Sequence, residues 1–177
     1  MKRVELEHVL RASAAITLEN SFVIVGSQAV LLEFPDAPAE LLLSNELDLY
    51  PAVHPERSEL IDGAIGQLSM FHDTVGYHAD GVGPDTAVMP ADWMTFSTLH
   101  CIGELSAVCP DLHDIAVSRC VAGRDKDAAW VRALLRHDMI KLARFVERLG
   151  QLDPVLHPPE RLIAWANRRA AEAAITP

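Results

Sequence analysis

Two acidic residues at alternate positions, Glu46 and Asp48, are the first feature of this sequence that could carry chemistry. Residues 41–50 alternate well enough between apolar and polar to predict a strand. Side chains two residues apart on a strand point to one face, so both carboxylates project together while Leu47 and Leu49 face the core. Like charges this close repel unless water or a cation separates them, and Mg²⁺ prefers carboxylate oxygens. The motif therefore fits either a divalent-cation site or a solvent-facing edge strand.

A glycine–serine turn, Gly26-Ser27, follows a short apolar run in residues 22–25 and precedes a predicted helix over residues 28–33. The run predicts a strand buried on both faces, and Ser27 is expected to cap the helix. A helix N-terminus presents unpaired N–H groups and the positive end of the helix dipole, which together favour phosphate. Gly26 lets a phosphate approach the backbone, and Ser27 adds a hydroxyl donor. Such turns are also common as plain structure, so both interpretations stay open.

A third predicted strand, residues 76–80, ends at Asp80 and leads into a loop over residues 81–84. A single Asp at the end of a strand is usually a turn residue. Asp80 becomes a candidate metal ligand only if the fold brings it beside Glu46 and Asp48. In that case the three carboxylates would form one cluster.

The C-terminal third carries a charged helical cluster. Asp111, Asp114 and Ser118 are three and four residues apart, so they share one face of a predicted helix. The next helix begins among four charged residues, and the two acidic ones are candidate caps: Arg124, Asp125, Lys126 and Asp127. A solvated charged turn explains this cluster as well as a binding role does.

The remaining periodicity predicts further elements of both kinds. Helices are expected over residues 3–19, 55–70, 111–122, 126–137, 139–150 and 159–173, and short edge strands over 87–89 and 94–96. Strands dominate the first part of the chain and helices the second, which predicts an α+β fold. We expect a small mixed sheet within residues 1–110 and a helical part over residues 111–177 that packs on it.

The net charge of −10 is distributed unevenly along the 177 residues. Residues 1–118 carry 4 basic and 18 acidic side chains, a net charge of −14, whereas residues 119–177 carry 11 basic and 7 acidic, a net charge of +4. A mostly acidic surface repels phosphate, which excludes wholesale coating of nucleic acid. An acidic first part suits divalent cations, and it is equally typical of an ordinary solubilised surface.

Composition also indicates the compartment. The longest apolar-rich run, residues 22–32, is shorter than the roughly 20 residues of a membrane helix, so no membrane partner is expected. Glu5 and Glu7 lie where a signal peptide needs an apolar core. The three cysteines form no C-x-x-C pair, which favours reduced thiols in a cytoplasmic protein. His100, Cys101, Cys109 and His113 match no standard zinc spacing, so no zinc site is predicted from them.

In combination, these motifs resemble a known family. The order of strand, Gly-Ser turn and helix, then a strand with paired acids and a third acid on a later strand, is similar to the DNA polymerase β-type nucleotidyltransferases. The resemblance is closest to small bacterial branches that include the type IV abortive-infection toxins. It is carried by four stretches that together span about residues 22–136: VIVGSQAVL, LLSNELDLYP, YHADGVGPDTAVMPADW and DLHDIAVSRCVAGRDKDAAWVRALL.

The resemblance implies a small nucleotidyltransferase core that moves an NMP group from a nucleoside triphosphate to an RNA or protein acceptor. It implies Mg²⁺ held by Glu46, Asp48 and Asp80, with Gly26 and Ser27 on the triphosphate. For the toxin-like relatives it also implies an antitoxin partner. The C-terminal motif adds a catalytic acid and two nucleotide-binding cations, here Asp127, Arg119 and Lys126.

Two residues depart from the family pattern. Glu46 stands where the family more often has Asp, which moves the carboxylate outward by roughly 1.5 Å, and Mg²⁺ demands near-ideal geometry. Arg119 replaces a Lys, exchanging a mobile point charge for a planar fork. The alternative is therefore a catalytically inactive member that binds a nucleotide or a partner protein. In the active case, Arg119 and its basic neighbours are expected to line the rim of the site and attract the triphosphate.

Overall fold

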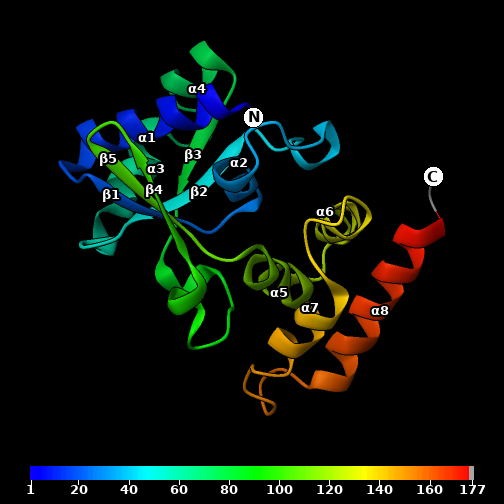
Figure 1. The fold of residues 1–177 in the computed structure, drawn as a ribbon. Helices are drawn as coiled ribbons and strands as arrows, with labels where there is room; N and C mark the ends of the chain where they lie inside the picture. The colour runs from blue at the N-terminus through cyan, green and yellow to red at the C-terminus, as the bar shows by residue number, and fades with distance from the viewer. Residues whose placement is uncertain (176–177) are drawn as a thin grey trace. The chain divides into compact units, whose positions relative to one another are not determined.

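The computed structural model describes residues 1–175 and divides into two compact units. The sheet unit comprises Met1–Ala87 and Ser97–Pro110. The helical unit comprises Val88–Phe96 and the chain from Asp111 onward. Figure 1 labels the helices and strands of both units along the ribbon. Each unit is described by itself below.

The sheet unit is built on one five-stranded mixed sheet with the strand order β3-β2-β1-β5-β4. The strands are β1 (Ser21–Ile24), β2 (Glu46–Pro51), β3 (His78–Gly81), β4 (Thr98–Ile102) and β5 (Leu105–Cys109). The pairs β1–β5 and β2–β3 are parallel, whereas β1–β2 and β4–β5 are antiparallel. Strand β1 lies at the centre, and its Phe22, Val23 and Ile24 are at most 1% exposed. This burial explains the unbroken apolar run in the sequence.

Four helices belong to the sheet unit: α1 (Arg3–Thr17), α2 (Val30–Glu33), α3 (Ser58–Ile65) and α4 (Met70–Val75). Helix α1 buries Leu6, Val9 and Leu10, an i, i+3, i+4 stripe that packs against β2 and β5. Helix α3 packs against β3 and against α1 (Figure 1). These two helices therefore form one layer over the sheet.

The alternation of side chains along β2 and β3 defines what each face carries. Leu47, Leu49 and Ala79 are fully buried, and the same set of alternate positions includes Gly81. A Cβ on Gly81 would overlap the carbonyl oxygen of Ser58 at the start of α3, so this face is covered by α3. The intervening positions, which carry the acidic residues, point to the opposite face.

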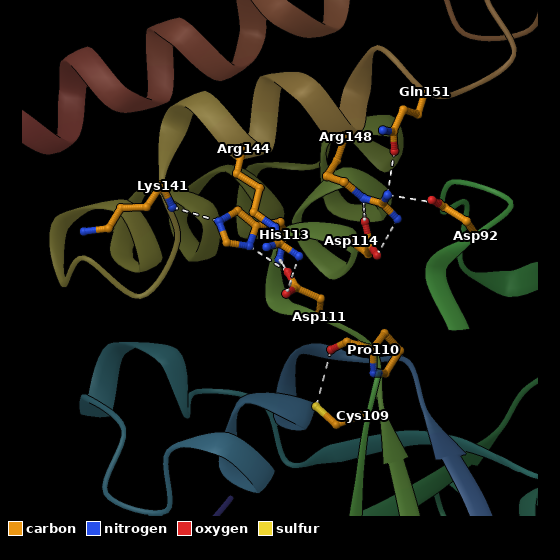
Figure 2. Close-up of polar contacts among 10 residues, drawn as sticks. All are labelled: Asp92, Cys109, Pro110, Asp111, His113, Asp114, Lys141, Arg144, Arg148 and Gln151. Atoms are coloured by element: carbon orange, nitrogen blue, oxygen red, sulfur yellow. Dashed lines mark hydrogen bonds and ion pairs between the residues drawn. The ribbon is translucent and has the colours of Figure 1, made fainter. Parts of the chain in front are cut away.

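The helical unit contains α5 (Leu112–Ala122), α6 (Asp125–Arg136), α7 (Leu142–Leu149) and α8 (Pro159–Ile175). Helix α7 packs against α5 and α8, and α6 packs against α5 and α8. Arg148 is the polar centre of this unit (Figure 2): it binds Asp114 through Nε and Nη2 at 2.6 and 2.8 Å, and Asp92 through Nη1 at 2.9 Å. Its guanidinium also lies 4.7 Å from the ring centroid of Phe96. Arg148 thereby holds the segment Val88–Phe96 in the helical unit.

These observations confirm the predicted fold class, an α+β chain with a mixed sheet followed by helices. The predicted edge strands over residues 87–89 and 94–96 are wrong: Trp93–Phe96 is a 3₁₀ turn, and the strands come later, as the hairpin β4–β5. A two-residue loop joins this hairpin, and Gly103 in it has φ +64°. Such positive angles are what a tight hairpin loop requires.

Two further local predictions also differ from the structure. The single helix expected over residues 55–70 is instead a 3₁₀ turn, then α3, then α4, interrupted where Leu68 has φ +65°. Ser27 does not cap a helix, because Gly26 takes the capping position and Ser27 begins the 3₁₀ turn Ser27–Ala29. Within residues 1–175, no helix combines the length and the apolar character that crossing a bilayer requires.

Candidate functional site

The parallel pairing of β2 with β3 brings the predicted acids together. Asp48 and Asp80 are register partners, and Glu46 pairs one step earlier with His78. All four side chains occupy the same set of alternate positions, so they share the face opposite to α3. The three acids are partly exposed, whereas His78 is only 6% exposed. Asp80 therefore lies beside Asp48, as a shared site requires.

Three side chains on this face form a tight group of potential metal ligands. One ligating atom each from Glu46, His78 and Asp80 lies within 4.8 Å of the others. The Nε2 atom of His78 is 3.3 Å from Oδ1 of Asp80. The Nδ1 atom of His78 is buried without a hydrogen-bond partner among the described residues. The group thus adds an imidazole to the two carboxylates.

His78 is the residue that sequence reasoning missed. It lies two positions before Asp80 on the same strand, which is the spacing that identified Glu46 and Asp48 as a pair. Its partner ring is His72, whose centroid lies 4.5 Å away. The spacing of two residues therefore places His78 and Asp80 on one face of the strand. It does not show that the imidazole and the carboxylate approach each other.

Asp48 is not part of this three-atom group, because its carboxylate lies against the Gly26 turn. A Cβ added to Gly26 would overlap Asp48 Oδ2 and lie 2.7 Å from its Cγ and 2.9 Å from its Cβ. Contacts this short do not occur between real side chains, so any larger residue here would displace the Asp48 side chain. The backbone N–H of Val25 also donates to the carbonyl of Asp48 at 3.1 Å. The turn and the acidic strand are thus joined at Asp48.

Ser27 lies next in the turn and is 9% exposed. The 3₁₀ turn Ser27–Ala29 continues directly into the four-residue helix α2. So short a helix contributes only a small dipole, because the macrodipole grows with the number of aligned peptide units. The turn's role at this site is therefore close backbone approach at Gly26 rather than a strong helix field.

The other three predicted site residues lie in the helical unit, and two of them bind each other. Arg119 Nη1 donates to Asp127 Oδ1 at 2.9 Å, and Arg124 Nε donates to Asp127 Oδ2 at 2.6 Å. Asp127 is 1% exposed and Arg119 is 9% exposed, whereas Lys126 is exposed. Asp127 also accepts from the backbone N–H of Arg124, at the start of α6. This geometry gives Asp127 and Arg119 a structural task, joining α5 to α6.

Burial raises the pKa of Asp127, but hydrogen bonds from Arg124 and Arg119 outweigh it and hold that pKa below its ordinary value. The carboxylate therefore stays charged at neutral pH and is fully engaged by guanidinium groups. His113 is likewise fixed, because its Nδ1 is 2.6 Å from Asp111 and its Nε2 accepts from the Lys141 N–H at 2.9 Å (Figure 2). Asp111 and Asp127 of the helical unit are thus both held by basic partners.

Comparison of the chain with protein-family models, with curated proteins and with solved structures gave no match. The resemblance to nucleotidyltransferases consequently remains a prediction carried by motifs. The fold adds the register of β2 and β3 and the approach of Gly26 to Asp48. These two features are the observations on which a functional proposal can be built.

Proposed function

We propose that this chain is a metal-dependent nucleotidyltransferase that moves an NMP group from a nucleoside triphosphate to an RNA or protein acceptor. The observation that carries the proposal is the register pair Asp48–Asp80 on two parallel strands, with Glu46 and His78 one step earlier on the same face. This arrangement supports a site at which two neighbouring strands offer carboxylates to the same ligand. The family resemblance supplies the reaction.

The residues of the face fit a divalent cation. Glu46, His78 and Asp80 offer ligating atoms within 4.8 Å, and Asp48 adds a carboxylate on the next register pair. When bound, a divalent cation neutralises charge on the triphosphate and on the departing pyrophosphate. Glu46 and Asp80 would hold it through carboxylate oxygens, the ligands that Mg²⁺ and Mn²⁺ share. The family resemblance places the triphosphate at the Gly26 turn, against which the Asp48 carboxylate lies.

The proposed reaction is a displacement of pyrophosphate from the α-phosphorus of the nucleotide. The acceptor oxygen forms a bond to the α-phosphorus, the bond from that phosphorus to the bridging oxygen breaks, and pyrophosphate leaves. The acceptor hydroxyl gives its proton to solvent. Strands β2 and β3 of this chain hold the carboxylates in register. The Asp48 side chain is directed at the turn, where Gly26 has no side chain.

One observation favours the non-catalytic alternative, in which the site binds a nucleotide without turning it over. The tight ligand group contains Glu46 rather than Asp48, and the longer Glu side chain replaces the Asp that is common in the family. In this alternative the cation and the nucleotide still bind. Binding and turnover must therefore be measured separately.

The test is incubation with each labelled nucleoside triphosphate, with Mg²⁺ or Mn²⁺, and with or without total RNA. We expect metal-dependent labelling of RNA or protein that Asp48→Asn and Asp80→Asn each reduce by about 100-fold or more. The matched control is Asp36→Asn, an exposed carboxylate in the same unit, which should leave labelling unchanged. Calorimetry with ATP or GTP in Mg²⁺ and in EDTA accompanies the assay. Metal-dependent binding without labelling supports the non-catalytic alternative, and equal affinity in both buffers argues against both.

A further inference from the structure

A second group of potential metal ligands lies elsewhere in the sheet unit. It consists of Glu33, the last residue of α2, His100 in the middle of β4 and Cys109, the last residue of β5. One ligating atom from each lies within 4.8 Å of the other two. None of the three belongs to the proposed nucleotide site. Sequence spacing did not indicate this group, because Glu33 precedes His100 by 67 residues.

The sheet register explains why His100 and Cys109 meet. Thr98 pairs with Cys109 across the antiparallel hairpin, and His100 lies two positions from Thr98 on the same strand. Both side chains therefore project from one face, as diagonal neighbours. The adjacent Cys101 points to the other face and is exposed. Only one of the two thiols in the hairpin is thus available to this group.

Helix α2 supplies the third side chain. The Sγ atom of Cys109 lies 3.5 Å from the carbonyl oxygen of Ala29, which places the turn before α2 over the same face of the hairpin. From the end of that helix, Glu33 Oε1 reaches to 3.0 Å from His100 Nε2. Three separate elements therefore converge at one point.

We infer that Glu33, His100 and Cys109 form a zinc site that joins α2 to the β4–β5 hairpin. Thiolate sulfur, imidazole nitrogen and carboxylate oxygen are the three ligand types that Zn²⁺ takes, at about 2.0 to 2.3 Å. Ligands at such distances around a tetrahedral ion lie roughly 3.5 Å from one another. The present group reaches that spacing with side-chain adjustments of about 1 Å.

Charge and burial support the same assignment. A thiolate and a carboxylate together carry two negative charges, which one Zn²⁺ neutralises, with the neutral imidazole as third ligand. Cys109 is 1% exposed, whereas the side chains of His100 and Glu33 are 20% and 34% exposed. The sulfur end of the site is therefore dry and the carboxylate end is open to solvent. Water takes the fourth position on the open side.

Without a metal, the same contacts stabilise the fold only weakly. The pair His100–Glu33 is partly exposed, and such pairs contribute at most about 1 kcal/mol. The thiol of Cys109 donates to the carbonyls of Ala29 and Pro110 at 3.5 and 3.4 Å, and a thiol is a weak donor. Zinc replaces the thiol proton, which is released to solvent.

The test is metal titration of the whole chain with Co²⁺ and Zn²⁺. We expect one thiolate-bound cobalt per chain, seen as a thiolate-to-cobalt charge-transfer absorption, and release of that cobalt by zinc. Cys109→Ser should abolish the thiolate absorption and weaken zinc binding by at least about tenfold, measured by competition with a chromophoric chelator. Two matched controls, Cys101→Ser and Cys120→Ser, should retain both properties. Cys101 and Cys120 lie outside the ligand group, so their variants report on nonspecific thiol binding.

Further variants separate this site from folding defects and from the nucleotide site. His100→Gln and Glu33→Gln change partly exposed side chains, so both variants should fold. Each should retain a weaker thiolate-to-cobalt absorption and bind zinc about tenfold less tightly. Asp48→Asn should keep zinc binding whether or not nucleotidyl transfer is found. The proposal is overturned if Cys109→Ser retains the absorption, if Cys101→Ser removes it, or if the unaltered chain binds no zinc.

Discussion

Aspartate carboxylates have different surroundings in the two units. In the helical unit, Asp114 and Asp127 are at most 1% exposed, and each receives two short hydrogen bonds from guanidinium groups. In the sheet unit, Asp48 and Asp80 are partly exposed and are register neighbours of one another. One arrangement surrounds carboxylates with guanidinium groups, and the other sets two carboxylate residues in register on neighbouring strands.

This difference shows what each group of acids can do. A carboxylate that is buried against arginine holds helices together, and its removal leaves a buried cation without its partner. Carboxylates that neighbour one another raise the energy of the metal-free protein, and a cation relieves that repulsion. The charge distribution agrees with this division, since the sheet unit carries 4 of the basic side chains and the helical unit carries 11.

The largest effect is expected from breaking the buried pair of the helical unit. Asp114→Ala leaves Arg148 buried, with Asp92 as its remaining carboxylate, and should lower the free energy of unfolding of this unit by about 3–5 kcal/mol. All three tryptophans, Trp93, Trp130 and Trp165, lie in the helical unit, so tryptophan fluorescence in urea reports on its unfolding.

The matched control is Glu147→Ala, an exposed acid on the same helix as Arg148. It should change stability by less than about 0.5 kcal/mol. A loss below 1 kcal/mol for Asp114→Ala would contradict the view that this carboxylate is structural.

The next effect tests the contact between Gly26 and Asp48. Gly26→Ala places a Cβ against the Asp48 side chain and should cost about 1–3 kcal/mol of stability in the sheet unit, through overpacking. It should also remove metal-dependent nucleotide binding, because Asp48 must move. Circular dichroism in urea and calorimetry measure the two effects.

A double variant sharpens this test. Asp48→Ala removes the two atoms closest to the new Cβ, so Gly26→Ala should cost less in that background than in the unaltered chain. Equal costs in both backgrounds would mean that the two residues do not interact in the way the structure indicates.

Local patterns in the sequence predict much of the sheet unit. The apolar run at β1, the alternation at β2 and the short strand at β3 each follow from side-chain periodicity, which acts over a few residues. The hairpin β4–β5 was missed because its first strand is largely exposed, with Leu99 60% exposed, and gives no clear apolar face. Its usable signal was Gly103 between two short strands.

The two groups of metal ligands lie beyond local pattern. Their members meet through strand register and through the placement of α2 over the hairpin, both of which depend on pairing between distant residues. Sequence spacing therefore predicted the pair Glu46 and Asp48, the family resemblance added Asp80, and neither could include Glu33. The pairing of Arg119 with Asp127 is similar, since it requires the turn at Gly123, where φ is +64°.

A smaller effect is expected from acid. The pKa of Asp127 is lowered in the folded state, so the folded protein holds fewer protons there than the unfolded chain does. Its contribution to stability is complete above the unfolded value of about 3.9 and is lost as the pH falls from there through the lowered pKa. Below about pH 4, Asp127→Asn should therefore lose less stability than the unaltered chain does.

The difference in free energy of unfolding between the unaltered chain and Asp127→Asn isolates Asp127 from other carboxylates. One of these is Asp111, whose pKa is also lowered by its hydrogen bonds with His113. Urea unfolding followed by tryptophan fluorescence at several pH values measures it. Parallel stability curves between pH 2 and pH 5 would show that the guanidinium groups do not favour the charged form of Asp127.

The smallest effect concerns metal choice at the proposed nucleotide site, and it depends on that proposal. His78 brings an imidazole nitrogen to 3.3 Å from Asp80, and nitrogen ligands favour Mn²⁺ and later transition metals over Mg²⁺. His78→Gln offers an amide of similar length, whose oxygen suits Mg²⁺, so the ratio of Mn²⁺ to Mg²⁺ affinity should fall by about tenfold, or about 1.4 kcal/mol. Electron paramagnetic resonance of Mn²⁺ under competition by Mg²⁺ measures this ratio.

The matched control is His54→Gln, a more exposed histidine of the same unit that lies outside the ligand group. If His78→Gln leaves the ratio unchanged while Asp80→Asn abolishes binding, the carboxylates alone hold the ion and His78 only fills the edge of the sheet. If both variants bind as the unaltered chain does, the acidic face of the sheet unit is not a metal site, and the contrast with the paired acids of the helical unit has no functional meaning.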